Sequence, residues 1–311
     1  MRPSAVRLFE IRNMKQSSSW LHAAAVYTDP RAVVLFFLGF SAGVPIMLIF
    51  SSLSLWLSEA GVSRDMVTMF SWAALAYSFK FVWAPLIDSL PLPVLGRLGW
   101  RRSWLLLSQA AVASAIVWMA MVDPAQPGAL AMMAAAAVLL GFSSATQDVV
   151  IDAYRIEVAG DDTAMQSVMS ATYNAGYRVG MIVSGAGALY AAETLGSKSG
   201  HYVYAAWQQT YFLMAAVMAV GMATVLLMRE PEVAARADNR RSLADSLRLI
   251  VLFLGSVSAF AAMFSWFGGL FSKQDNALLG LLVEVAPHSL VNFEVKDDAL
   301  LGLLVEAAMQ Y

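Results

Sequence analysis

Charged side chains inside long apolar stretches are the residues of this sequence best suited to chemistry. Lys80 and Arg178 each stand within such a stretch, and a third stretch holds Asp148 and Asp152, with Arg155 just after it. Their spacing of four and three residues places the last three on one face of a helix. A charge at the centre of a membrane-spanning helix costs on the order of 2.5 to 3.5 kcal/mol, so each of these groups needs a partner or a hydrated cavity.

We predict that these groups line a polar cavity for an anionic, hydrogen-bonding solute. The predicted solute or proton pathway consists of Lys80, Gln147, Asp148, Asp152, Tyr173, Tyr177 and Arg178. In this hypothesis the cations, the amide and the phenols hold the solute, and a carboxyl group exchanges a proton with water or a basic partner. The alternative is purely structural: Asp148 neutralises Lys80, and Asp152 neutralises Arg155, as static ion pairs.

Other kinds of site have weak support. The chain has no cysteine, and its three histidines, at 22, 201 and 288, are too scattered for a local metal cluster, so we expect no metal and no cofactor. Gly39 to Gly43 match the G-x-S-x-G pattern of a nucleophile elbow. That elbow requires a strand before the serine, whereas here an apolar helical stretch surrounds it. We expect no enzyme activity and no nucleic-acid partner.

The stretches that carry these residues are long and apolar enough to cross a lipid bilayer. Hydrophobic residues make up 59% of the chain, charged residues 14%, and the mean hydropathy is +0.63. A spanning helix needs about 20 mostly apolar residues. The predicted spans are 32–57, 66–87, 103–122, 129–153, 166–192 and 204–228, with a seventh near 247–271. The fold class is therefore an all-α, polytopic transmembrane helix bundle in a lipid bilayer.

The positions of the basic residues predict the orientation of this bundle. Most of the twenty Lys and Arg residues fall on one side if the N-terminus is cytoplasmic, whereas Arg64 and Lys198 fall on the other. By the positive-inside rule, we predict a cytoplasmic N-terminus and an even number of spans before residue 229.

Small and helix-breaking residues predict how the first and fifth spans pack. Gly39 and Gly43 are four residues apart, as are Gly176 and Gly180, which favours close approach of helix backbones. Pro45 lacks a backbone donor and predicts a kink or a break in the first span.

The loop after the second span is similar to a stretched form of the major facilitator signature. Residues 83–88 end in an aspartate, and residues 99–102 end in two arginines. In that superfamily the loop gates between inward-facing and outward-facing states. The resemblance implies a gate formed by Asp88, Arg101, Arg102 and Arg155.

Six segments resemble the AmpG-type muropeptide permeases of that superfamily. They are GFSAGVP (39–45), SLWLSEAGVS (54–63), KFVWAPLIDSLPLP (80–93), RRSWLLLSQ (101–109), SATQDVVIDAYRIE (144–157) and GYRVGMIVSGAGALY (176–190). The resemblance implies proton-linked import of anhydromuropeptides across a bacterial inner membrane, in peptidoglycan recycling and β-lactamase induction. The alternatives are a related carrier for siderophores or other bulky solutes, or a non-transporting membrane fragment that needs a partner half.

The predicted spans, together with this resemblance, divide the chain into segments. We predict a cytoplasmic N-terminal segment (1–30), a six-helix transmembrane bundle (31–230), a cytoplasmic linker (231–246), a seventh transmembrane helix (247–271) and an atypical tail (272–311). Major facilitators have two six-helix halves, so we expect the N-terminal half here and a second half-transporter or a homodimer as partner. The resemblance stops near residue 273.

The tail contains a near repeat, 275–284 against 297–306, whose apolar runs are too short to span a bilayer. We interpret this tail as a truncated or rearranged reading frame or, alternatively, as a partner-binding or interfacial segment.

Overall fold

The computed structural model divides the chain into two units, 1–264 and 265–311, and the residues it describes all belong to the first. The described residues are 25–71, 77, 80, 83–88, 92, 95–231, 251, 254, 255, 258, 259 and 262. Every regular element among them is a helix, apart from one isolated antiparallel bridge between Lys198 and His201. The predicted all-α fold class is confirmed for this part of the chain.

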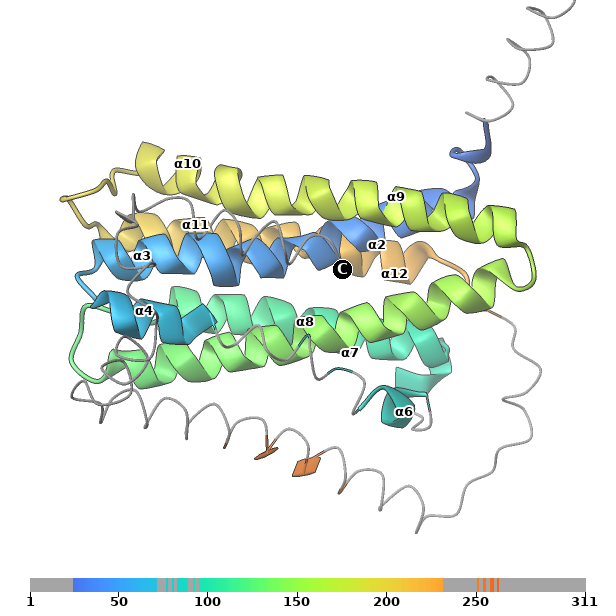
Figure 1. The fold of residues 1–311 in the computed structure, drawn as a ribbon, viewed down its shortest axis with the longest axis horizontal. Coiled ribbons are helices and arrows are strands. Elements are labelled where there is room, and N and C mark those ends of the chain that lie inside the picture. Colours follow the sequence, from blue (N-terminus) through green and yellow to red (C-terminus); the bar gives the residue numbers. More distant parts are fainter. Residues whose placement is uncertain are drawn as a thin grey trace, which may run out of the picture. The chain divides into compact units, whose positions relative to one another are not determined.

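The helices run alongside one another as a bundle (Figure 1). They are α2 (Pro30–Met47), η1 (Leu48–Ser52), α3 (Leu53–Glu59), α4 (Arg64–Ser71), α6 (Ala84–Ile87), η4 (Leu95–Leu98), α7 (Trp100–Ala120), α8 (Ala129–Ala159), α9 (Thr163–Ile182), η5 (Val183–Gly187), α10 (Ala188–Thr194), α11 (Tyr204–Val217) and α12 (Ala219–Leu227). η1 and η5 are single π-helical turns, so α2 runs on into α3 and α9 into α10.

Four of these runs are long and apolar enough to cross a membrane. They are Pro30–Glu59, Trp100–Ala120, Ala129–Ala159 and Tyr204–Leu227. They coincide with the first, third, fourth and sixth predicted spans. The fifth is helical from α9 through α10 but more polar, because it carries Asn174 and Arg178. The second and seventh predicted spans lie only partly within the described residues, and the domain boundaries stay a prediction.

Local sequence signals explain where two of these helices begin. Asp29 precedes α2, where its Oδ1 accepts a hydrogen bond of 2.8 Å from the backbone N–H of Arg31, and Pro30 occupies the first turn. Asp162 caps α9 in the same way, with Oδ1 3.0 Å from the backbone nitrogen of Met165.

The expected break at Pro45 takes the form of a widened turn rather than an interruption. Pro45 lies inside α2, and the helix continues through the π-helical turn η1 into α3. The π-helical turn η5 faces η1, because Ser52 Oγ donates a hydrogen bond of 2.8 Å to the backbone carbonyl of Ser184. The two irregular turns are therefore joined across the bundle.

The closest helix contact is between α2 and α9. Each of four glycines faces a backbone carbonyl of the opposite helix: Gly39 faces Tyr173, Gly43 faces Tyr177, Gly176 faces Phe36, and Gly180 faces Phe40. A side-chain carbon at any of these positions would overlap that carbonyl oxygen. The predicted packing through paired glycines is therefore confirmed.

Two apolar clusters fill the bundle, which also contains a small layer of buried polar side chains. One cluster gathers around Trp56, Trp207 and Tyr211, the other around Trp104 and Tyr154. At the first, Trp56 stacks on Trp207 with ring centroids 5.8 Å apart. The polar layer contains fully buried Ser41, Gln109 and Gln147.

We expect Gly176→Ala to lower the stability of the bundle by at least about 1 kcal/mol, because overpacking a rigid backbone contact forces the helices apart. Gly187→Ala is the matched control, since its added carbon would meet only an atom at 3.8 Å. The thermal unfolding midpoint of the purified protein in detergent measures both changes. Equal midpoints for the two variants would contradict the assignment of α2 and α9 as a backbone-to-backbone contact.

Candidate functional site

The centre of the candidate site is Asp148 on α8. Its side chain is buried, with 8% of its surface exposed, and its Oδ1 lies 3.2 Å from the hydroxyl of Tyr173 on α9, which donates to it. The rings of Tyr173 and Tyr177 lie 5.9 Å apart. One turn earlier on α8, Ser144 Oγ lies 2.6 Å from the hydroxyl of Tyr77. The structure thus brings three predicted site residues together and adds Tyr77 and Ser144.

Asp152, one helical turn beyond Asp148, lies between two cations. Its carboxylate is 3.8 Å from Lys80 Nζ and 3.2 Å from Arg155 Nη2. Arg155 also donates to Ser170 Oγ at 3.1 Å. The predicted ion pair between Asp152 and Arg155 is present, and whether it is static stays a prediction. Lys80, however, makes its ion pair with Asp152 rather than with Asp148, because the Asp148 carboxylate lies deeper in the bundle against Tyr173.

Solvent exposure sets the strength of these pairs. The side chains of Lys80, Asp152 and Arg155 are 35%, 45% and 25% exposed. Ion pairs this open to solvent contribute little stability, so their partners can exchange at low cost. Lys80 is also near enough to Asp148 to interact with it electrostatically. Lys80 can therefore neutralise the carboxylate of either Asp148 or Asp152.

Gln147 points away from Asp148, into the polar layer of the bundle. Its Nε2 donates to Ser41 Oγ at 3.0 Å, and Gln109 Nε2 donates to the same oxygen at 3.3 Å. The Oε1 atoms of both amides are buried without a hydrogen-bond partner among the described residues. Neighbouring residues of a helix point in different directions, so Gln147 and Asp148 do not share a face. A role for Gln147 in solute binding stays a prediction.

Arg178 lies on a face of α9 that is exposed in the bundle, together with Asn174 one turn earlier. Tyr173 and Tyr177, by contrast, are partly buried. A basic side chain at the middle of a membrane-spanning helix is costly against acyl chains. This face of α9 is therefore suited to contact water or another protein surface. The role of Arg178 in the solute or proton pathway stays a prediction.

A second charged cluster forms where α7 begins. The Arg101 side chain is 4% exposed and donates from Nη1 to Asp88 and from Nη2 to Glu157, each at 2.6 Å. Arg101 Nε adds two contacts of 3.1 Å to the Glu157 carboxylate. A buried guanidinium held by two carboxylates is a strong, geometrically specific junction. It joins the residue after α6 to the end of α8.

Glu230 and Arg102 connect the start of α7 to the end of α12. The Glu230 carboxylate accepts from the backbone N–H groups of Arg101 and Arg102, at 2.8 and 3.1 Å. The Arg102 guanidinium donates to the carbonyls of Val225 and Leu226, at 3.0 and 2.7 Å. The Glu230 carboxylate at the start of α7 and the Arg102 guanidinium at the end of α12 both interact favourably with the helix dipoles.

The predicted gate residues therefore divide into three places. Asp88 and Arg101 meet directly, Arg102 bonds to the end of α12, and Arg155 lies beside Asp152. No metal cluster of three or more His, Cys, Asp or Glu side chains occurs among the residues that the structure describes.

Comparison with known proteins identifies the family. Residues 32–305 match the Major Facilitator Superfamily. The chain belongs to this superfamily. Since the match extends past residue 273, the expectation that the resemblance stops there is wrong at the level of the superfamily.

Curated relatives of this major facilitator chain carry transporter names. It is 35% identical over 226 residues to the putative transporter AmpG 4 of Rickettsia conorii, covering 73% of this chain and 52% of the relative. It is also 35% identical over 207 residues to the anhydromuropeptide permease of Escherichia coli, covering 66% and 39%. The resemblance to AmpG-type permeases is confirmed. The chain spans about half the length of the relatives it matches, or less.

Family membership and the four candidate spans together show a multi-pass membrane protein. The contacts of Arg101 in the structure add two site residues of this major facilitator that the sequence analysis does not predict. Glu157 and Glu230 were not singled out, although Glu157 ends the permease-like segment 144–157. Each lies at a helix end, where a charged residue is usually solvated, and only the fold directs them toward Arg101.

We expect Arg101→Gln to destabilise the protein by about 3 kcal/mol, because it leaves the carboxylates that surround it without their cation. The matched control is Arg97→Gln, in the short helix η4, where the side chain is exposed. Thermal unfolding in detergent measures the difference. An Arg101→Gln variant as stable as the Arg97→Gln control would show that the cluster does not hold α7 and α8 together.

Proposed function

We propose that this chain forms the solute-binding, proton-exchanging half of an importer of anhydromuropeptides, carrying them from periplasm to cytoplasm across a bacterial inner membrane. The observation that carries the proposal is the buried Asp148 carboxylate, hydrogen-bonded by Tyr173 and close to Lys80, within a bundle of candidate membrane spans. The names of the relatives, a putative AmpG transporter and an anhydromuropeptide permease, supply the solute class.

The polar groups of the site suit such a solute. Muropeptides combine sugar rings with peptide carboxylates, so they require hydrogen-bond donors, aromatic surfaces and cations. Tyr173 and Tyr177 supply phenol rings, and Lys80 and Arg178 supply positive charge from two different helical segments. In this proposal the carboxylates of the solute compete with Asp152 for Lys80, whose existing ion pair is half-exposed and weak.

Proton coupling follows from the burial of Asp148. A proton that arrives from the periplasm neutralises this carboxylate and weakens its attraction to Lys80. The neutral form tolerates an apolar environment, so protonation favours the arrangement of helices in which the site is closed to water. The ion pairs of Asp152 stay available to hold Lys80 in the other arrangement.

The proposed orientation places the N-terminus and the Arg101 cluster on the cytoplasmic side. Asp88, Arg101 and Glu157 then form the cytoplasmic gate, and opening it requires the guanidinium to leave at least one carboxylate. The exposed, polar face of α9 meets the second half of the carrier, which we propose is another half-transporter or a second copy of this chain. That partner completes the solute cavity.

The direct test is uptake of labelled anhydromuropeptide by cells that lack their own permease and express this chain, after its insertion in the membrane is verified. Uptake that stops on addition of an uncoupler is the expected result. Competition with siderophores separates the two solute classes. Absence of uptake despite insertion would contradict transport by this chain alone and favour a half that needs a different partner.

We expect Asp148→Asn to reduce uncoupler-sensitive uptake by about tenfold or more, because an amide cannot exchange the coupling proton. The amide oxygen can still accept the hydrogen bond from Tyr173, so the fold should be kept. Asp161→Asn, at an exposed position between α8 and α9, is the matched control. Unchanged, uncoupler-sensitive uptake by Asp148→Asn would remove this residue from the proton pathway.

A further inference from the structure

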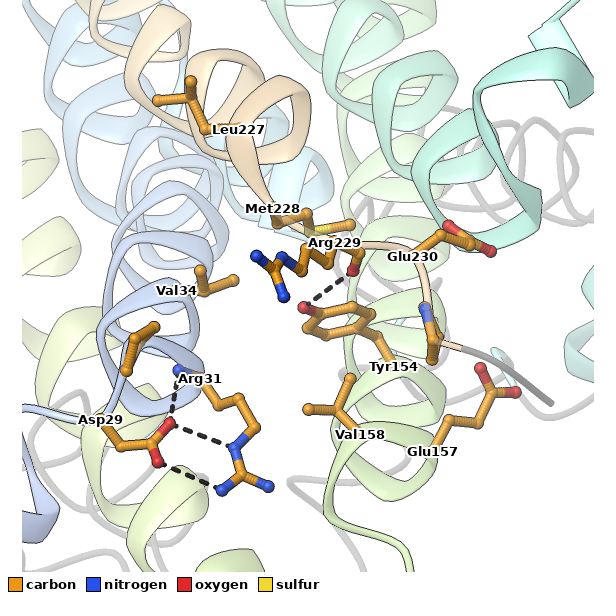
Figure 2. Close-up of a pocket in the computed structure, with 12 residues that line it drawn as sticks. Asp29, Arg31, Val34, Tyr154, Glu157, Val158, Leu227, Met228, Arg229 and Glu230 are labelled. Carbon is orange, nitrogen blue, oxygen red and sulfur yellow. Dashed lines mark hydrogen bonds and ion pairs between the residues drawn. The ribbon is translucent and has the colours of Figure 1, made fainter.

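A cavity of about 640 Å³ lies where α2 begins and where α8 and α12 end (Figure 2). Its polar lining comes from Asp29, Arg31, Tyr154, Glu157, Arg229 and Glu230. None of the groups around Asp148 lines it, so it is separate from the candidate solute site.

The carboxylates of this cavity are already engaged. Asp29 accepts three hydrogen bonds from Arg31, one from its backbone N–H at 2.8 Å and two from its guanidinium at 3.1 Å. These bonds hold the pKa of the Asp29 carboxyl below its ordinary value. Glu157 and Glu230 accept hydrogen bonds from the start of α7, as described above. No lining carboxylate is therefore left over for a cationic ligand.

Arg229, by contrast, brings a positive charge that no described residue accepts. Its guanidinium has no hydrogen bond or ion pair to any residue within the described ranges, and only its backbone carbonyl is engaged, by the Tyr154 hydroxyl at 3.4 Å. Figure 2 shows this guanidinium in the space between Val34 of α2 and Tyr154 of α8. The Arg31 guanidinium also lines the cavity, beside Asp29, to which it donates from Nε and Nη2. The cavity thus offers donors to a ligand that carries acceptors and negative charge.

The position of the cavity favours a lipid over a soluble anion. α2 begins one candidate membrane span and α12 ends another, so the cavity lies at the level where the spans meet the headgroup region. Exposed apolar side chains occur on the helices that form it: Leu227 lines the cavity and is 85% exposed, and Leu226 of α12 and Phe37 of α2 are 53% and 41% exposed. Surfaces of this kind accept acyl chains beside a bound headgroup.

We propose that this cavity binds an anionic phospholipid, with its phosphate held by Arg229 and Arg31 and its acyl chains against Val34 and Leu227. An anionic headgroup is favoured over a zwitterionic one, because each lining carboxylate that could receive a headgroup ammonium is occupied. This site does not depend on which solute the protein carries.

The test uses the full chain, purified in detergent and stripped of lipid, with dioctanoyl phosphatidylglycerol as the probe. Native mass spectrometry measures retained lipid across a titration. We expect Arg229→Gln to weaken binding by about fivefold. Arg97→Gln, which changes an exposed arginine outside the cavity, should leave binding unchanged. Equal binding by the two variants would overturn the proposal.

Two further comparisons decide the kind of ligand. Dioctanoyl phosphatidylcholine that binds as tightly as phosphatidylglycerol would overturn the choice of an anionic lipid. Inorganic phosphate that displaces the lipid at equal concentration would overturn the choice of a lipid.

A steric pair of variants tests the cavity without changing its charge. Val34→Phe fills space inside it, whereas Val33→Phe adds the same bulk at an exposed position that does not line it. We expect only Val34→Phe to reduce phosphatidylglycerol binding, and equal retention by both would contradict the site. Thermal unfolding without lipid verifies that each variant is folded, so this pair decides the question if Arg229→Gln does not fold.

Discussion

The backbone contact between α2 and α9 is the constraint on which the rest of this bundle depends. Four glycines leave no room for a side-chain carbon between the two helices, and the carbonyls of Tyr173 and Tyr177 pack directly on α2. This contact sets the rotation of α9, and that rotation carries the Tyr173 hydroxyl to Asp148 on α8. The candidate site is thus built on a helix pair that has almost no freedom to turn.

Charges inside the bundle follow one rule at both of its charged clusters. The guanidinium of Arg101 is almost fully buried and is held by two carboxylates, as a charge removed from water requires. Lys80, Asp152 and Arg155 are more open to solvent, and their pairs are correspondingly longer. The buried Arg101 cluster suits a junction between helices that is either fully formed or fully broken. The exposed ion pairs of Asp152 suit charges that change partners during a transport cycle.

The Arg101 cluster and the proposed lipid cavity share two side chains. Glu157 and Glu230 hold the start of α7 and also line the cavity between α2, α8 and α12. A ligand in that cavity therefore lies next to the residues that we assign to the cytoplasmic gate. This adjacency offers a physical route by which the surrounding bilayer would affect gating.

By itself, the sequence determined the features that depend on local pattern. Apolar length predicted the helical spans, the paired glycines predicted close backbone packing of the first and fifth spans, and the family motifs identified the superfamily. Only the tertiary structure decided which carboxylate pairs with Lys80, that Gln147 turns toward Ser41, and that Glu157 and Glu230 converge on the start of α7. The physical reason is that residue spacing sets which side chains share a face of one helix. The partner across the bundle depends on the rotation and depth of a helix that is distant in the chain.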